Sequence, residues 1–294
     1  MAKITAAQVK ELRDATGIGM MDGKRALEEA EGDFDRAVEI LREKGLSNAA
    51  KKQDRIAAEG LSEVFVDGNR AAVVEVNSET DYVAKNADFQ NLVTQIAEAV
   101  AKAGPTTLEE AKEASVEGTD MTIDELITEK TNTIGEKLEL RRFFFIEKTD
   151  DQVFGPYVHT GGQIATLVVL NGGNEETAHD IALHVSALNP RFLSRDEVPQ
   201  DVIEKEKSIQ IETAKNEGKP ENIVEKMVEG RMHKWLGEIS LVDQSFVKDS
   251  DISVGEFAKQ NDATVGSFVR IAVGEGVEKR QENLADEVSK ELNK

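Results

Sequence analysis

An acidic residue followed directly by an aromatic one, Asp81-Tyr82, is the most informative feature of the sequence. It follows the run Ala71–Val76, whose β-branched content predicts a buried strand. From Asn86 onward, apolar residues recur at helical spacing, which predicts a helix. Loops held between rigid elements often carry function. Asp81-Tyr82 is therefore either a binding tip or a connector whose tyrosine folds back onto its own domain.

Two further features have side chains suited to binding. Met20 and Met21 occupy a predicted turn between helices, flanked by Arg13 and Lys24, and methionine adapts to irregular surfaces. The same methionines can instead fill the core of a small domain. His159 opens a predicted hairpin turn, where its imidazole is available for contact.

The sequence lacks the patterns of common catalytic and metal sites. Its four histidines are His159, His179, His184 and His233. They form no H-E-x-x-H motif and no cluster with metal-ligand spacing, and His184 is expected to be a packed helix residue. The loop Gly17–Arg25 fails the phosphate-loop pattern, because Ile18 replaces a required glycine. Carboxylates are too numerous for one pair to stand out as acid and base, so we expect no enzyme and no cofactor.

The bulk composition narrows the classes of partner. The net charge is −21 over 294 residues, with 39% hydrophobic and 32% charged side chains. A chain this acidic repels phosphate backbones, and Lys51-Lys52 and Arg141-Arg142 are only short basic clusters, so we expect no direct nucleic-acid binding. The absence of cysteine excludes disulfides and thiolate zinc sites and suits a reducing compartment. With no run of transmembrane length and no signal-peptide pattern, we expect a cytoplasmic protein without a membrane partner.

The methionines belong to a predicted three-helix domain over residues 1–46. Thr16–Gly19 breaks the first helix. Asp22 is expected to cap the second, and a third is expected to run from its cap Asp33 to Gly45. Residues 47–60 are charged and rich in alanine, which predicts a helical linker.

The structural plan around Asp81-Tyr82 is predicted to occur twice, in residues 61–150 and again in residues 151–198 with 237–276. Each half contains a strand hairpin, a helix across it and a returning strand, which makes a small α+β sandwich. The predicted strands are Leu61–Val66, Ala71–Val76, Arg141–Glu147, Gln152–Val158, Ile164–Leu170 and Ser267–Val273, and the predicted helices begin near Asn86, Ile123 and Glu175, the second of them reaching Leu138.

An excursion over residues 199–236 interrupts the second half. Two helical patterns, Val202–Asn216 and Glu221–Leu236, flank a turn and predict an antiparallel helical hairpin. The hairpin either packs on its own domain or serves as an interaction arm. Residues 277–294 are predicted to form a C-terminal helix that docks back. The expected fold class is α+β, with a small N-terminal three-helix domain, a duplicated sandwich core, a protruding helical hairpin and a C-terminal helix.

Several segments, taken in order, resemble those of one protein family. Leu12–Leu27, with Gly17-Ile18-Gly19-Met20-Met21 within it, is similar to the N-terminal signature of bacterial translation elongation factor Ts. Glu75–Lys85 is similar to the second signature, and Glu225–Arg231 and Val273–Gly276 are similar to later segments. The likeness covers nearly the whole chain, and the matching spacing of all these segments makes it specific.

The resemblance implies a guanine nucleotide exchange factor for elongation factor Tu, the GTPase that delivers aminoacyl-tRNA to the ribosome. It implies binding to the GDP-bound and nucleotide-free GTPase without covalent chemistry. It also implies an N-terminal domain similar to ubiquitin-associated domains and a hairpin at about residues 199–236 through which a homodimer can form.

The resemblance further assigns roles to individual residues. It implies that a tip formed by Thr80, Asp81, Tyr82 and Val83 wedges into the GTPase near its Mg²⁺, so that the ion is lost. It implies that Arg13, Met20, Met21 and Lys24 contact the nucleotide-binding domain, and that Ile134, Gly135 and His159 make other contacts. Two positions depart from the family pattern: Tyr82 replaces a common Phe, and Gly23 replaces a frequent Cys.

Two other classes of function remain open on the sequence. A non-catalytic scaffold or chaperone-like module would bind basic partners through its acidic surface without changing GDP release. An enzyme with a cryptic carboxylate site is the other alternative, although no nucleophile, metal or cofactor motif supports it.

Overall fold

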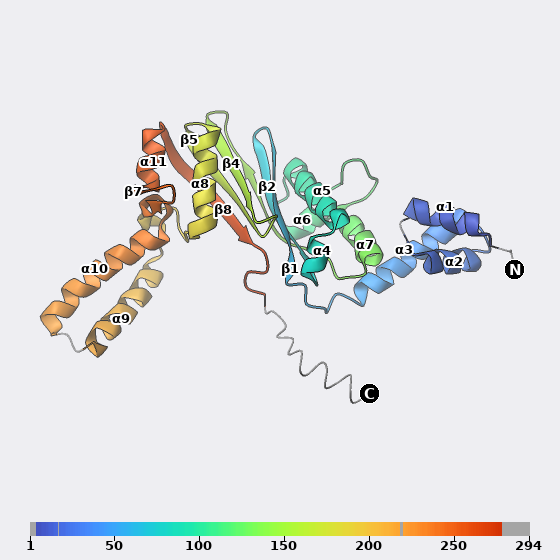
Figure 1. The fold of residues 1–294 in the computed structure, drawn as a ribbon, viewed down its shortest axis with the longest axis horizontal. Coiled ribbons are helices and arrows are strands. Elements are labelled where there is room, and N and C mark those ends of the chain that lie inside the picture. The colour runs from blue at the N-terminus through green and yellow to red at the C-terminus, as the bar shows by residue number, and fades with distance from the viewer. Residues whose placement is uncertain (1–3, 17, 218–219, 278–294) are drawn as a thin grey trace. The chain divides into compact units, whose positions relative to one another are not determined.

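The computed structural model describes residues 4–16, 18–217 and 220–277. These residues fall into two compact units, the first from the described parts of 1–63, 74–145 and 272–294, the second from 64–73 and 146–271. The described residues contain both helices and antiparallel strands, with helices alone at the N-terminus, which confirms the predicted α+β class (Figure 1). The predicted C-terminal helix, from Glu278 onward, lies outside the described residues.

Three helices form the N-terminal helical domain: α1 (Ala6–Thr16), α2 (Met20–Glu29) and α3 (Phe34–Ala50). Their apolar faces meet in a small core that contains the fully buried Leu12 and Leu27. Asp33 caps α3 as predicted, because its Oδ1 accepts a hydrogen bond of 2.8 Å from the backbone N–H of Arg36.

Two boundaries predicted for these helices are wrong. Helix α2 begins at Met20 behind an extended Gly19, so Asp22 lies in the first helical turn and is not the cap. Helix α3 continues past Gly45 to Ala50, so the segment 47–60 is helical only at its start. Gly45 does not end the helix. A Cβ at this position would lie 2.6 Å from Nδ2 of Asn132, so the glycine allows the close approach of another helix.

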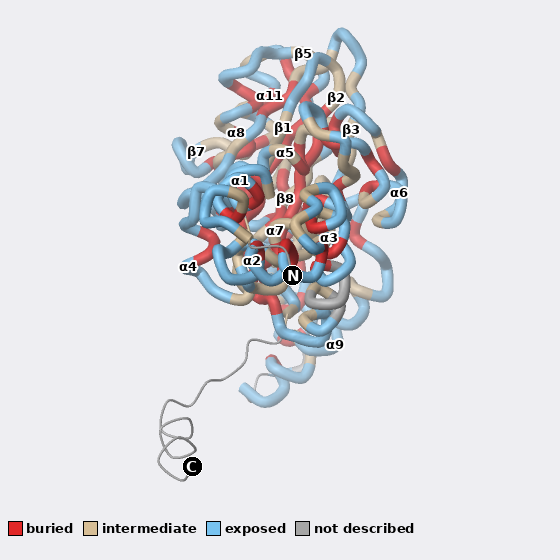
Figure 2. Tube along the Cα trace, turned by 90° about the vertical axis from the view of Figure 1, so that its right-hand side faces the viewer, coloured by how far each residue is buried: buried red, intermediate tan, exposed pale blue. Residues whose placement is uncertain are grey.

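The first sheet has the strand order β1-β2-β3, formed by β1 (Glu59–Asp67), β2 (Arg70–Ser78) and β3 (Glu139–Glu147). Strand β2 is buried from Ala71 to Ser78, which explains its apolar run (Figure 2). Between β2 and β3 lie four helices: α4 (Asp81–Ala84), α5 (Ala87–Ala103), α6 (Leu108–Lys112) and α7 (Ile123–Ile134). The helix predicted to reach Leu138 ends at Ile134, because Gly135 adopts a left-handed conformation with φ of 91°.

The second sheet has the order β4-β5-β8, formed by β4 (Gln152–His159), β5 (Ile164–Gly172) and β8 (Ala263–Ala272). Helix α8 (Glu175–Leu188) packs on the antiparallel β4–β5 pair through Ala178, Ile181 and Val185. The sequence of hairpin, helix and returning strand therefore recurs, as predicted. The short elements β6 (Ser245–Phe246), β7 (Asp249–Ser253) and α11 (Val254–Gln260) precede β8 and were not predicted.

The predicted helical hairpin consists of α9 (Gln200–Asn216) and α10 (Glu221–Ile239), which lie side by side (Figure 1). Its apolar residues pack between the two helices in a cluster that includes Ala214, Val228 and Met232. Within the described residues, no helix combines the length and the apolar character that a membrane crossing requires.

A buried carboxylate joins β2, β3 and the segment after β8 within the first unit. Glu75 is fully buried, and it accepts hydrogen bonds from Nη1 of Arg141 at 2.8 Å, Nε of Arg142 at 2.5 Å and the backbone N–H of Gly274 at 2.8 Å. Nη2 of Arg142 also donates to the carbonyl oxygen of Ala272 at 2.9 Å. Charge-assisted hydrogen bonds therefore hold the returning chain against the first sheet.

A second buried polar group, His184 on α8, connects that helix to the segment around β6. Its Nδ1 accepts a hydrogen bond of 3.1 Å from the backbone N–H of Val247, so the ring proton must reside on Nε2. Nε2 then donates to Oε1 of Gln244 at 2.9 Å. Burial lowers the pKa of His184, and the bond to Gln244 offsets only part of this shift. His184 is thus a packed helix residue, as the sequence predicted, and its contacts and lowered pKa favour the neutral form.

Replacing Glu75 with alanine is expected to lower the free energy of unfolding by about 3 kcal/mol, because two guanidinium groups lose their buried partner. Urea denaturation followed by circular dichroism measures the change. Glu147→Ala is the matched control, because Glu147 is exposed and pairs with Arg70 at 3.6 Å. The Glu147→Ala change should lower the free energy of unfolding by less than about 1 kcal/mol. Equal midpoints for the two variants would contradict a structural role for Glu75.

His184 predicts a loss of stability on acidification. Histidine in an unfolded chain has a pKa of about 6.5, and the pKa of His184 in the folded state is lower. Below about pH 6.5 the unfolded chain therefore binds more protons than the folded chain. Stability contributed by neutral His184 is therefore present above about pH 6.5 and is lost as the pH falls toward the folded pKa. His184→Asn should show a smaller drop in unfolding free energy between about pH 7.5 and about pH 5.5 than the wild type. The control His233→Asn changes an exposed histidine. If the drop in unfolding free energy is reduced equally in both variants, His184 is not the group responsible for it.

Candidate functional site

The tip predicted from Asp81-Tyr82 is a single turn of helix that follows β2. Thr80 is extended, with φ of −127° and ψ of 154°, and its side chain accepts a hydrogen bond from the backbone N–H of Val83. Val83 and Ala84 are buried, each with 5% of its surface exposed, whereas Tyr82 is 81% exposed. The helical turn therefore directs Val83 inward and Tyr82 into solvent. The alternative of an inward-folded tyrosine is wrong for this structure.

Two glutamates connect the tip to the residues that follow α7. The carboxylate of Glu136 accepts hydrogen bonds from the backbone N–H of Thr80 at 3.0 Å and from its hydroxyl at 2.7 Å. In the opposite direction, Oε1 of Glu79 accepts from the backbone N–H of Lys137 at 2.6 Å. We call these contacts the reciprocal brace. It holds the segments 79–80 and 136–137 together and fixes the base from which Tyr82 extends.

The reciprocal brace also brings two other predicted residues close to the tip. Ile134 ends α7 and is half-buried, and Gly135 caps that helix and is exposed. Both directly precede Glu136, which is bonded to Thr80. Ile134 and Gly135 therefore share one region of the first unit with Asp81 and Tyr82.

Asp81 is exposed at the tip and is paired within its own helical turn. Nζ of Lys85 donates to Oδ2 of Asp81 at 2.7 Å, and this hydrogen bond holds the pKa of Asp81 below its usual value. The same contact raises the pKa of Lys85. Both groups are exposed, so the pair contributes little to stability, but it keeps the Asp81 carboxylate ionised beside Tyr82.

The second predicted group, on the N-terminal helical domain, is exposed as a binding surface requires. Met20 and Met21 are 45% and 61% exposed, and both belong to the first turn of α2 rather than to a turn between helices. They are absent from the core cluster around Leu12. Arg13 and Lys24 are also exposed, on α1 and α2, and pair with Asp14 and Glu28.

His159 lies in the second unit, at the end of β4, and its side chain is exposed. The hydroxyl of Tyr157 lies 2.8 Å from its Nδ1. The structure thus gathers the tip, Ile134 and Gly135, while His159 forms a separate feature of the other unit.

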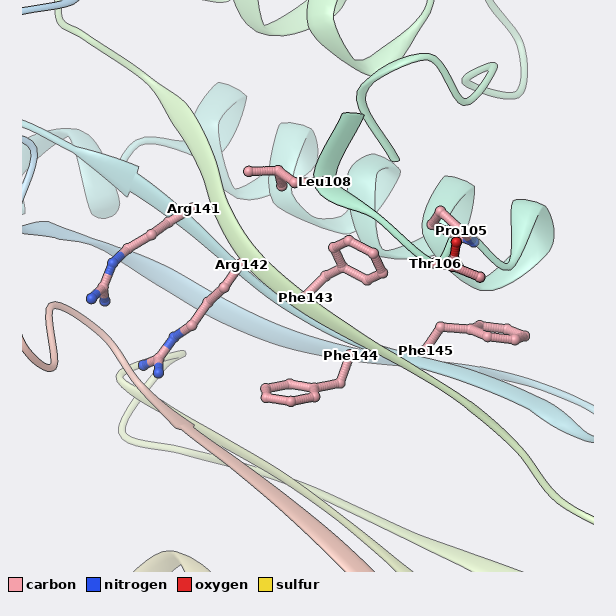
Figure 3. A pocket seen from close by; sticks show the side chains of 8 residues that line it. All are labelled: Pro105, Thr106, Leu108, Arg141, Arg142, Phe143, Phe144 and Phe145. Atoms are coloured by element: carbon pink, nitrogen blue, oxygen red, sulfur yellow. The ribbon is translucent and has the colours of Figure 1, made fainter. Parts of the chain in front are cut away.

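A cavity of about 500 Å³ in the first unit is lined by Pro105, Thr106, Leu108 and the β3 segment Arg141–Phe145. In Figure 3, Phe143 and Phe144 leave β3 on opposite sides, as strand geometry requires. The Thr106 hydroxyl donates to Glu110 and both arginines bind Glu75, so these groups are already engaged. Among the described residues, no group of His, Asp and Glu side chains is placed to hold a metal ion.

Known proteins of one family match nearly the whole chain. The family model described as "Elongation factor TS" matches residues 79–275. The chain is 54% identical over 292 residues to elongation factor Ts of Lacticaseibacillus casei strain BL23, covering 99% of both chains. It is 52% identical to elongation factor Ts of Lactiplantibacillus plantarum over 292 residues, again 99% of each.

The chain belongs to the elongation factor Ts family. The resemblance stated from the sequence is thereby confirmed. The elongation factor Ts family model begins at Glu79, so it includes the tip and Glu136 but not the α2 methionines. The relatives extend the match over the N-terminal helical domain, since they cover 99% of this chain.

Sequence reasoning missed Glu79, Lys85 and Glu136. Lys85 follows Asp81 at the i, i+4 spacing of a helical ion pair, so its role was readable once a helix was recognised there. Glu136 is 56 residues from Thr80, and nothing in local spacing indicates that bond.

Replacing Glu136 with alanine is expected to loosen the tip without unfolding the domain. The backbone N–H and the hydroxyl of Thr80 both lose their acceptor on Glu136. The N–H should therefore exchange with deuterium about tenfold faster, which corresponds to a free energy of local opening that is lower by about 1.4 kcal/mol. Residue-resolved hydrogen exchange measures this rate. Glu98→Gln, which removes a carboxylate paired with Lys102 on α5, is the matched control and should leave Thr80 unchanged. Unaltered Thr80 exchange in Glu136→Ala would refute the brace.

Proposed function

We propose that this chain is a guanine nucleotide exchange factor for elongation factor Tu, acting in translation elongation by protein–protein binding without covalent chemistry. The observation that carries the proposal is the tyrosine tip: Tyr82 is 81% exposed on a helical turn braced at its base. Membership of the elongation factor Ts family supports the assignment of the partner. The GTPase partner, rather than this chain, supplies the nucleotide and the Mg²⁺.

The proposed mechanism is insertion of Asp81 and Tyr82 near the Mg²⁺ site of the GTPase. A bound guanine nucleotide is held by phosphate-loop amides, a lysine and Mg²⁺. A side chain that occupies this region is incompatible with that arrangement, so the ion and then GDP leave. Burial of an aromatic ring contributes about 1.5–3 kcal/mol toward the complex. Since the brace already orders the tip, little conformational entropy is lost on insertion.

Thermodynamic linkage sets the direction of the reaction. If the factor binds the nucleotide-free GTPase more tightly than the GDP form, GDP weakens factor binding by the same ratio. Either nucleotide can then expel the factor, so exchange is accelerated without selection of the product. The Tyr82 hydroxyl, absent from the common Phe, needs a hydrogen-bond partner or water if the ring is buried.

Other exposed residues are proposed as additional contacts. Ile134 and Gly135 directly precede Glu136, which bonds to Thr80, and this supports the proposal that they contact the same region of the partner as the tip. Arg13, Met20, Met21 and Lys24 present a mixed apolar and basic surface for the nucleotide-binding domain. His159 is proposed as a contact made by the second unit.

The proposed domains are the N-terminal helical domain, which α3 extends to Ala50, a core N-subdomain at residues 61–150, a core C-subdomain at residues 151–198 with 237–276, the helical hairpin at residues 199–236 and a C-terminal segment at residues 277–294. The hairpin of residues 199–236 is proposed as the surface through which a second copy binds. Its exposed Ile209 and Ile223, at 50% and 44%, offer apolar area for such a contact. A cytoplasmic location follows from the proposed role in translation.

The deciding experiment is stopped-flow release of a fluorescent GDP analogue from elongation factor Tu. Wild type should accelerate release, and Asp81→Ala combined with Tyr82→Ala should lower this acceleration about 10- to 100-fold, because the burial of the ring is lost. Tyr82→Phe is the matched variant and should retain most of the acceleration. Glu113→Ala, an exposed change outside the proposed surfaces, should behave as wild type.

Full activity of the double variant would refute the wedge. Binding of wild type to elongation factor Tu without faster GDP release would refute exchange activity and favour the scaffold alternative.

A further inference from the structure

Three aromatic rings form a row in the second unit. Nδ1 of His159 lies 2.8 Å from the hydroxyl oxygen of Tyr157, and the two rings stack with centroids 5.9 Å apart. His179 of α8 meets the ring of Tyr157 edge-on, with centroids 5.4 Å apart. Nδ1 of His179 lies 3.0 Å from the carbonyl oxygen of Pro156, which can only accept, so this nitrogen carries a proton. The row is thereby anchored to the backbone at its His179 end.

Strand geometry explains why these rings meet. Tyr157 and His159 are two residues apart on β4, so their side chains share one face of the sheet. Tyr157 is partly buried against the core beneath α8, while His159 is exposed. The backbone of His159 is fixed as well, because its carbonyl oxygen accepts from the N–H groups of Gly162 and Gln163 at 3.2 and 3.1 Å. The orientation of the imidazole and the position of its proton are then the remaining variables.

We propose that Tyr157 is a positioning residue that selects the tautomer of His159 presented to the GTPase, an inference that rests on the proposed function. The phenol hydroxyl donates to Nδ1, so the ring proton stays on Nε2 and points away from Tyr157. A phenol oxygen shares its lone pair with the ring and is a better donor than acceptor, whereas an unprotonated imidazole nitrogen accepts readily. His159 thus offers one N–H donor, and the matching group on the partner is a carbonyl or carboxylate oxygen.

His179 has a supporting role in this arrangement. Its edge contact limits rotation of the Tyr157 ring, and its own bond to Pro156 fixes the position of that edge. A histidine without such support interconverts between two neutral tautomers, only one of which can donate from Nε2.

The first test removes the hydroxyl alone. Tyr157→Phe keeps the ring against His179 and should lower kcat/KM for GDP release from elongation factor Tu about fivefold, the loss expected for one hydrogen bond. His159→Ala should lower it by at least as much, and the double variant should match His159→Ala alone, since Tyr157 acts through that residue. Ser267→Ala removes an exposed hydroxyl on β8 of the same unit and serves as the control.

The second test reads the tautomer directly in the free protein. Imidazole nitrogen NMR should show His159 of the wild type as the Nε2–H form, and Tyr157→Phe should convert it to a mixture. Additive losses in the double variant, unchanged kcat/KM in Tyr157→Phe, or an Nδ1–H form in the wild type would each overturn the proposal. If wild type fails to accelerate GDP release, the proposed function fails, while the NMR measurement still decides the tautomer.

Discussion

The carboxylate of Glu75 is the constraint on which the first unit depends. A buried charge is tolerated only where opposite charges and N–H donors surround it, and Arg141, Arg142 and the backbone of Gly274 provide them. These bonds fasten β2 to β3 and to the chain returning after β8. Because the tyrosine tip follows the end of β2, the strand held by Glu75 also sets where the tip begins.

Hydrogen bonds to carboxylates also hold the tip in place at the surface. Glu79 and Glu136 exchange hydrogen bonds between two loops, and Thr80 uses its hydroxyl both as a helix cap and as a donor to Glu136. Val83 is buried beneath, so the helical turn has a fixed inner face. An exposed tyrosine on this fixed helical turn lowers the stability of the fold only slightly. Its ring buries apolar surface only when a partner covers it.

Much of the fold was readable from local chemistry, and the errors have physical causes. The helices that begin near Asn86 and near Glu175 were predicted correctly, because caps and apolar periodicity agree there. Gly45 was wrongly predicted to end its helix. A glycine that leaves room for Asn132 of another helix cannot be told from a C-cap glycine by sequence alone. Asp22 was misread as a cap for a similar reason, because an acid in the first turn and an acid at the cap are both favourable.

The sequence by itself determined the α+β class, the repeated plan of hairpin, helix and strand, the lack of catalytic motifs, and the family resemblance at Met20-Met21 and Asp81-Tyr82. These depend on residue type and short spacing. Only the tertiary structure decided that Tyr82 faces solvent, that Glu136 holds Thr80, and that Tyr157 lies against His159 and His179. The physical reason is that exposure and long-range hydrogen bonds depend on which elements pack together, and local sequence does not encode that packing.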